Sequence, residues 1–200
     1  MVASDVSLVG PSVVLRPPTP GDVDAVWEAV TESVLELSRW MAWCHPGYSP
    51  EEARAWVHGC VGGWERGEGF EFLVTDRTTG ALLGACGLNQ IDHLNRRANL
   101  GYWVRTRATG RGVATEAAAL ALHFGIAELE LGRIEIVAAV ANGASRRVAE
   151  KLGATREGVA RNRFLLGGDY VDGVQFSLVP ADLQTRNRGP GEGVLAPDAS

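Results

Sequence analysis

The sequence predicts a single α/β domain, and three observations lead to this prediction. The chain has 200 residues, about the size of one domain with a short appendage. Hydrophobic residues make up 46% and charged residues 22%, which is typical of a globular protein with a sizeable core. Segments with a helical hydrophobic period are interspersed with segments that alternate every second residue, as strands do. We expect one domain over residues 1–180 and a disordered tail over 181–200, which is rich in Gly, Pro and polar residues.

Two amphipathic helices are expected in the first third of the chain. Thr19, followed by a proline, fits an N-cap with proline at the first helical position, and apolar residues recur at helical spacing over 23–34. Ser49 and Glu52 have the spacing of a capping box before the second helix. The aromatic-rich segment 39–43 between them either packs in the core or closes over an apolar ligand.

Strands are expected after residue 69, where the hydrophobic period changes to two. Segment 134–141 is nearly all apolar, which is typical of a central strand buried on both faces. Two further helices are expected, one directly after Gly112 and one over 142–152 that ends at Gly153. The expected strands are residues 70–75, 82–89, 98–104, 134–141, 155–163 and 170–179.

The charge distribution argues against a general nucleic-acid binder, because the formal net charge is −5 and such a binder needs a basic face. Residues 1–92 hold 13 acids and 5 bases, whereas residues 93–115 hold 5 bases and no acid. Clustered arginines suit phosphate, but 18 of the 19 bases in this chain are arginine, so composition alone explains the cluster equally well. The five are Arg96, Arg97, Arg105, Arg107 and Arg111.

Several other classes are also disfavoured. The longest near-apolar stretch, residues 117–127, is far short of the roughly 20 residues that a membrane span needs. The first residues lack a basic segment leading into an apolar one, so we expect a cytoplasmic protein. Cys44, Cys60 and Cys86 are widely spaced and are expected to be reduced thiols, and the four histidines show no ligand spacing, so no metal is expected.

A glycine-rich turn at residues 107–112 connects an expected strand to an expected helix. This arrangement brings free backbone N–H groups and the positive end of a helix dipole together, which makes an anion site. A Walker A loop is excluded because no lysine is near, and a Rossmann fingerprint fits poorly because Thr115 stands where a third glycine or alanine is needed.

The same turn fits R/Q-x-x-G-x-G/A, the pyrophosphate loop of the GNAT superfamily of acetyl-CoA-dependent N-acetyltransferases, at every defined position. From Val13 to Val179 the chain resembles the branch of this superfamily that acetylates the N-terminal serine or alanine of ribosomal proteins. The flanking segments that carry the resemblance occur in the family's order and are residues 101–104, 115–117, 133–134, 142–145, 150–154 and 157–158.

The resemblance implies an α/β (α+β) GNAT fold with a mixed, mostly antiparallel sheet of about six to seven strands, flanked by about four helices. The sheet would be splayed in the middle, with acetyl-CoA in the gap. The backbone of Trp103, Val104 and Arg105 would pair with the pantetheine, Asn142 would contact the pantetheine arm, and Ser145 would lie near the thioester. The pyrophosphate would be held by Arg107, Gly110, Arg111, Gly112, Val113, Ala114 and Thr115.

Acetyl transfer to an amine needs a neutral nucleophile and a proton for the departing thiolate. Ser145 is the candidate proton donor, with a helix-capping serine as the alternative interpretation, and Asn142 has the same alternative as an N-cap. Tyr102 is a second candidate, although on the strand pattern it shares the apolar face and equally fits a core tyrosine.

The general base is where the sequence departs from the family. Members commonly have a glutamate in the strand where this chain has Asn99, which cannot accept a proton. Some members have a glutamate a few residues after the Glu157-Gly158 pair, where this chain has Arg163 and Phe164. Asp92 and His93 are the candidate substitutes. Without a base, kcat/KM should rise through the acceptor's own pKa, about 8 for an α-amine.

The function predicted from the sequence is transfer of an acetyl group from acetyl-CoA to a primary amine by direct attack in a ternary complex, with a protein N-terminal α-amine favoured. One alternative is a small-molecule or antibiotic N-acetyltransferase, and another is a non-catalytic acyl-CoA-binding regulatory module. The partners expected are the amine acceptor and neither nucleic acid nor membrane, in a monomer or homodimer.

Overall fold

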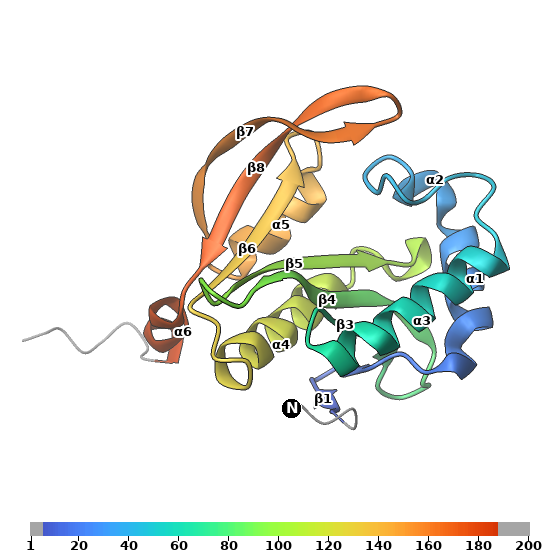
Figure 1. Ribbon diagram of the computed structural model, residues 1–200, viewed down its shortest axis with the longest axis horizontal. Helices are drawn as coiled ribbons and strands as arrows, with labels where there is room; N and C mark the ends of the chain where they lie inside the picture. Colours follow the sequence, from blue (N-terminus) through green and yellow to red (C-terminus); the bar gives the residue numbers. More distant parts are fainter. Residues whose placement is uncertain (1–5, 188–200) are drawn as a thin grey trace, which may run out of the picture.

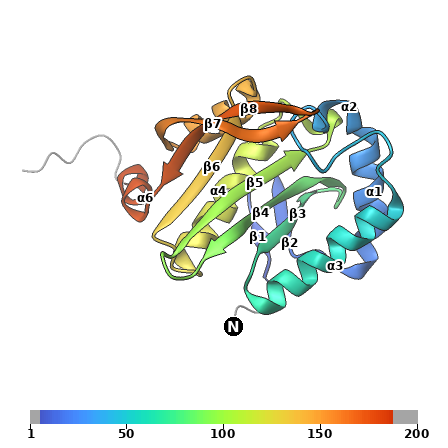
Figure 2. The ribbon, with the colours of Figure 1, turned by 45° about the horizontal axis from the view of Figure 1, so that its top comes forward.

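The computed structural model describes residues 6–187, which form a helix-flanked open sheet (Figures 1 and 2). The sheet has eight strands in the order β1-β2-β3-β4-β5-β6-β8-β7. All neighbouring strands are antiparallel except β5 and β6. The strands are β1 (Leu8–Val9), β2 (Val13–Arg16), β3 (Phe70–Asp76), β4 (Leu82–Asp92), β5 (Arg97–Val104), β6 (Arg133–Ala139), β7 (Thr155–Leu166) and β8 (Asp169–Leu178).

The described residues contain six α-helices and two short 3-10 helices. The mixed, mostly antiparallel sheet is confirmed, but both element counts exceed the expected ones. Short strands β1 and β2 extend the sheet at its N-terminal edge, and two short helices add to the four expected. The α-helices are α1 (Val23–Glu32), α2 (Val34–Leu37), α3 (Pro50–Arg66), α4 (Val113–Ala127), α5 (Gly143–Lys151) and α6 (Pro180–Asn187).

Local signals set the helix ends. The Ser49 side chain accepts from the Glu52 N–H, and the Glu52 carboxylate accepts from the Ser49 N–H, so the expected capping box begins α3. Gly153 has a φ of +74° just after α5, as expected of a helix-ending glycine. The first expected helix is broken: residues 20–22 form a 3-10 turn, and α1 and α2 are separated at Ser33, which is fully buried.

Two hydrophobic cores lie on opposite faces of the sheet because strand residues alternate between the faces. On one face, Phe72 and its neighbours pack against Phe124 of α4, with the two rings edge to face at 5.3 Å between centroids. On the other face, Leu73 and Trp103 pack with residues of α1 and α3. Figure 2 shows α4 and α3 on either side of the strands.

The sheet opens between its two parallel strands. β5 pairs with β6 only where residues 97–99 lie beside residues 133–135. Beyond that point β6 continues to pair with β8 up to Ala139, while β5 continues to pair with β4 up to Val104. The divergence is visible in Figure 1 and agrees with the expected splayed sheet.

The C-terminal segment differs in part from the expected disordered tail. Residues 180–187 form α6, whose Asp182 side chain accepts from the Val179 N–H at 2.9 Å, and Leu183 packs against the larger core. The Asp182 hydrogen bond and the Leu183 contact stabilise α6, which the composition of this segment did not predict. Residues 188–200 of the expected tail lie outside the described residues.

The three cysteines are buried and unpaired, in agreement with the expected reduced thiols. Within residues 6–187 no helix is long and apolar enough to cross a membrane. The same residues contain no group of three or more His, Cys, Asp or Glu side chains placed to hold a metal ion.

Candidate active site

The predicted anion-binding turn joins β5 to α4. Gly110 and Gly112 have φ values of +74° and +83°, in the left-handed region that favours glycine, and a Cβ added at either position would meet open space. The first helical hydrogen bond of α4 runs from the Glu116 N–H to the Gly112 carbonyl at 3.0 Å. Before it, the N–H groups of residues 113–115 have no acceptor in the described chain, and they lie at the positive end of the helix dipole.

Two arginine side chains of this turn are accessible to an anion. Arg107 and Arg111 are 60% and 59% exposed. Their nearest carboxylates are loosely placed, with Arg107 at 3.5 Å from Glu32 and Arg111 at 4.0 Å from Asp76. Long, exposed pairs of this kind contribute little to stability, so both side chains can turn to a phosphate at small cost.

Arg105 holds the start of the turn in place. Its N–H donates to the Leu83 carbonyl at 2.7 Å, and its own carbonyl accepts from the Ala108 N–H at 2.9 Å. The guanidinium is buried and donates to Glu28 and Glu32 of α1. The Arg105 side chain therefore fixes the turn to α1, and its carbonyl keeps one lone pair, so a backbone contact with the pantetheine stays a prediction.

A cavity of about 500 Å³ lies where β5 and β6 separate. It is lined by residues 99–103 of β5 and residues 136–139 of β6, and it therefore spans the opening in the sheet. The expected aromatic segment contributes Trp40 and Trp43 to the lining, so this segment closes over the cavity rather than only packing in the core. Further aromatic side chains line it: Trp56, Tyr102, Trp103 and Phe164.

Ser145, Asn142 and Tyr102 meet at this cavity. The Asn142 side chain accepts from the Ser145 N–H at 3.0 Å, so Asn142 is the N-cap of α5. The Ser145 hydroxyl has another partner, the Tyr102 hydroxyl at 3.0 Å, and Tyr102 also donates to the Ser145 carbonyl at 3.1 Å. Burial raises the pKa of Tyr102 to about 12, so this phenol is protonated at neutral pH.

Glu71 is a cavity residue that the sequence reasoning missed. It lies on β3, and its carboxylate accepts from the Asn89 side-chain amide at 3.1 Å. Asn99 in turn donates to the Asn89 side-chain oxygen at 2.9 Å, so the residue at the family's glutamate position is connected to an acid two strands away. A signal existed in the sequence, because Glu71 is the one acid within an apolar run from Phe70 to Val74.

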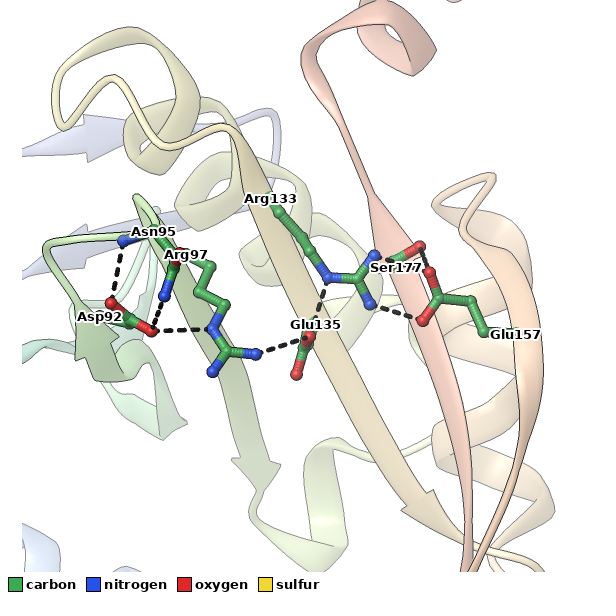
Figure 3. Close-up of polar contacts among 7 residues, drawn as sticks. All are labelled: Asp92, Asn95, Arg97, Arg133, Glu135, Glu157 and Ser177. Carbon is green, nitrogen blue, oxygen red and sulfur yellow. Dashed lines mark hydrogen bonds and ion pairs between the residues drawn. The ribbon is translucent and has the colours of Figure 1, made fainter.

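The candidate substitute bases lie away from the cavity lining. Asp92 accepts hydrogen bonds from Asn95 and pairs with Arg97, as Figure 3 shows. The Asn95 contacts, aided by Arg97, lower the pKa of Asp92 to about 2, which makes it a poor proton acceptor at neutral pH. His93 is exposed in the turn between β4 and β5. Glu157 binds Arg133 and Ser177 and is part of the same surface network.

A sheet that opens between two parallel strands, with an anion-binding turn at the end of one strand and a cavity in the opening, defines the class of acyl-CoA-dependent acyltransferases. Comparison with known proteins agrees. The family described as "Acetyltransferase (GNAT) domain" matches residues 12–155, and the chain belongs to this family of acetyltransferases.

Two curated relatives have names that refer to ribosomal proteins. YdaF of Bacillus subtilis (strain 168), a proposed ribosomal N-acetyltransferase, is 31% identical over 181 residues, which cover 88% of this chain and 96% of YdaF. The ribosomal-protein-serine acetyltransferase of Escherichia coli (strain K12) is 27% identical, with 82% of this chain and 90% of that protein covered.

Solved structures show the same fold. A structure of RimL, the ribosomal L7/L12 alpha-N-protein acetyltransferase, is 26% identical and has a TM-score of 0.78. The match covers 87% of this chain and 94% of the RimL chain. Another RimL structure, in complex with coenzyme A, has a TM-score of 0.82 at 24% identity, with 87% of this chain and 98% of that chain covered.

Proposed function

We propose that this acetyltransferase moves the acetyl group of acetyl-CoA to the α-amine at the N-terminus of a protein. The observation that carries the proposal is the continuity of the site: the anion turn lies at the end of β5, and the opening between β5 and β6 leads from there into the cavity. A pyrophosphate at the turn and an acyl group in the cavity would therefore belong to one extended ligand.

The cofactor contacts follow from groups that are free to make them. The pyrophosphate would bind the N–H groups from Gly110 to Thr115, with the Arg107 and Arg111 side chains beside it. The pantetheine would lie along the edge of β5 at Trp103 and Val104, where β6 has moved away, and would reach Asn142. RimL bound to coenzyme A supports this proposal at the level of the shared fold.

Direct transfer in a ternary complex is favoured over an acyl-enzyme. None of Cys44, Cys60 and Cys86 lines the cavity, and burial raises the pKa of each thiol. Within residues 6–187 the hydroxyl of Ser145 is hydrogen-bonded to the Tyr102 hydroxyl and to no basic side chain that would make it a nucleophile.

The reaction then needs one bond to form and one to break. The amine nitrogen attacks the thioester carbonyl carbon, the carbon–sulfur bond breaks, the nitrogen loses a proton to become the amide, and the departing thiolate takes a proton. The Ser145 and Tyr102 hydroxyls can supply that proton, because they share a hydrogen bond at the opening and the phenol stays protonated at neutral pH.

The relatives whose names refer to ribosomal proteins support an α-amine acceptor. An α-amine also has a lower pKa than a lysine amine, about 8 against about 10.4, so its ammonium gives up a proton more readily. A small amine is the second candidate, because the spermidine N(1)-acetyltransferase of Escherichia coli (strain K12) is 28% identical, although only 64% of that protein is covered.

The test is release of free CoA from acetyl-CoA with three acceptors: Ser- and Ala-starting peptides, and spermidine. The proposal expects release with the peptides at a higher kcat/KM than with spermidine. Binding of acetyl-CoA without turnover of any amine would favour a non-catalytic acyl-CoA-binding module instead.

A further inference from the structure

Glu71 is an acid placed in the cavity by the packing of two strands. It lies opposite Gly87 in the antiparallel pair β3–β4, and a Cβ at position 87 would collide with the Glu71 carboxylate. Glycine at position 87 therefore leaves room for this side chain. The backbone of Glu71 is fixed as well, because its carbonyl accepts from the Trp64 indole N–H at 2.7 Å.

A directional chain of amides orients the carboxylate. Since Glu71 can only accept when ionised, the Asn89 NH₂ group must point toward it, and this leaves the Asn89 oxygen facing β5. The Asn99 NH₂ group donates a hydrogen bond to that oxygen at 2.9 Å. A carboxylate at position 99 would instead repel the Asn89 oxygen, so asparagine at this position matches the neighbouring acid.

Glu71 differs from the other acids on this face of the sheet in having no cationic partner among the described residues. Glu135 and Glu157 both pair with Arg133, and Asp92 pairs with Arg97 (Figure 3). Burial raises the pKa of Glu71, and the hydrogen bond from Asn89 offsets part of that rise. The site therefore holds a desolvated acid that a positive charge or a proton would satisfy.

None of the other described ionisable groups around Glu71 supplies a positive charge to it, so a ligand would have to do so. The Cys60 thiol of α3 and the Cys86 thiol of β4 are buried near it, with raised pKa values, and are neutral. Tyr102 of β5 also lines the cavity and is neutral. Arg163 of β7 is the one basic side chain in the described lining, and its guanidinium lies over the Phe164 ring, 5.8 Å from the ring centroid. The aromatic walls suit a cation beside the acid.

We propose that Glu71 binds the acceptor ammonium and takes its proton, with Asn89 and Asn99 as positioning residues. This inference rests on the proposed function. The proton passes from the amine nitrogen to a Glu71 oxygen, and the freed lone pair forms the bond to the thioester carbon. The Ser145 and Tyr102 pair protonates the thiolate as the carbon–sulfur bond breaks, and the second proton that leaves the nitrogen restores this pair through solvent. Glu71 then loses its proton to water. This replaces the expectation, drawn from Asn99, that the enzyme depends on amine that is already neutral.

The test is the pH dependence of kcat/KM with two acceptors. One is a Ser-starting peptide, and the other is the same peptide with β-alanine in place of the N-terminal serine, which makes the amine more basic. With Glu71 as base, the acidic limb of the wild-type profile has the same midpoint for both acceptors. Glu71→Gln should lower kcat/KM at pH 7 by on the order of 10²-fold and make the midpoint follow each acceptor's own pKa. Glu135→Gln is the matched control, because Glu135 faces the same side but lies outside the cavity lining, and its profile should match the wild type.

Asn89→Ala provides a second variant that keeps the acid. Losing its hydrogen bond should raise the Glu71 pKa, so the midpoint should move to higher pH and remain the same for both acceptors. Wild-type midpoints that follow the acceptor, or a Glu71→Gln profile equal to the wild type, would overturn the inference while leaving acetyl transfer intact.

A wild-type enzyme that acetylates no amine would contradict the proposed function instead. Calorimetry of the Ser-starting peptide with the CoA-bound protein then tests the Glu71 site alone. The inference expects at least tenfold weaker binding by Glu71→Gln at pH 7, and equal affinities would overturn it.

Discussion

The Tyr102 hydroxyl lies 3.0 Å from the Ser145 hydroxyl, across the opening between β5 and α5. The N-terminal turn of α5 is capped by Asn142, so the Ser145 side chain is not needed as a cap and is available to Tyr102. The two interpretations left open for these residues thus separate: Asn142 caps the helix, and Ser145 takes part in a hydroxyl pair at the cavity.

Ser145→Ala should lower kcat by on the order of 10²-fold while the affinity for acetyl-CoA changes little, because a positioned proton donor acts mainly on the chemical step. Tyr102→Phe should have an effect of the same size, and the double variant should lose little more if the two hydroxyls act as one unit. Single-turnover kinetics and calorimetry with acetyl-CoA measure these effects. A Ser145→Ala enzyme with normal kcat and a lower melting temperature would assign a structural role to the serine.

Gly112→Asp should abolish binding of acetyl-CoA. The new carboxylate would meet the pyrophosphate at the turn with a like charge, and the side chain would occupy the approach to the backbone N–H groups. Gly67→Asp is a suitable control, since Gly67 also has a positive φ, +67°, and also faces open space, but ends α3 far along the chain from the turn. Unchanged affinity of Gly112→Asp in calorimetry would exclude this turn as the pyrophosphate site.

Arg105→Ala should destabilise the fold by about 2 kcal/mol, because it removes a buried guanidinium and leaves its carboxylate and carbonyl partners unsatisfied. Arg107→Ala should change stability by less than about 0.5 kcal/mol, since Arg107 is exposed and only loosely paired with Glu32. Urea unfolding monitored by tryptophan fluorescence compares the two. Equal effects would show that Arg105 does not tie the turn to α1.

Glu157 gives the stability a specific dependence on acid. Hydrogen bonds from Arg133 and Ser177 lower its pKa to about 2. A pKa that is lower in the folded state contributes stability above the unfolded value, about 4.3, and this contribution is lost as the pH falls toward 2. The effect is expected to be at most about 1 kcal/mol, because the pair is partly exposed.

Glu157→Gln should therefore flatten the fall in unfolding free energy between about pH 4.3 and pH 2. Denaturant unfolding at a series of pH values measures it. The same slope in the variant and the wild type would mean that this ion pair contributes nothing to folding.

Features set by neighbouring residues in the chain were predictable from the sequence. The capping box at Ser49, the helix-ending Gly153 and the turn at Gly110 and Gly112 depend on short-range geometry, and all four glycine or cap positions adopt the expected conformation. The opening between β5 and β6 was expected only through the family resemblance, since nothing in either strand's own pattern shows where their pairing ends.

Features set by contacts between distant residues were not predictable. Glu71, Asn89 and Asn99 come together only when three strands pair in one register. Arg105 belongs to the basic cluster by sequence, but its partners Glu28 and Glu32 lie on a helix more than 70 residues earlier. In both cases the sequence shows the residue type but does not show which distant residue it contacts.

The central claim is that the acceptor is an N-terminal α-amine, and it is tested most directly by a competition between two amines on one peptide. A Ser-starting peptide with one internal lysine is incubated with acetyl-CoA and the enzyme at pH 7, and mass spectrometry of fragments locates the acetyl group. A matched peptide with a blocked N-terminus serves as the control. The account predicts acetylation at the N-terminal amine, with the lysine modified more slowly because its more basic ammonium gives up its proton less readily. Preferential acetylation of the lysine, or equal rates for the free and blocked peptides, would contradict it.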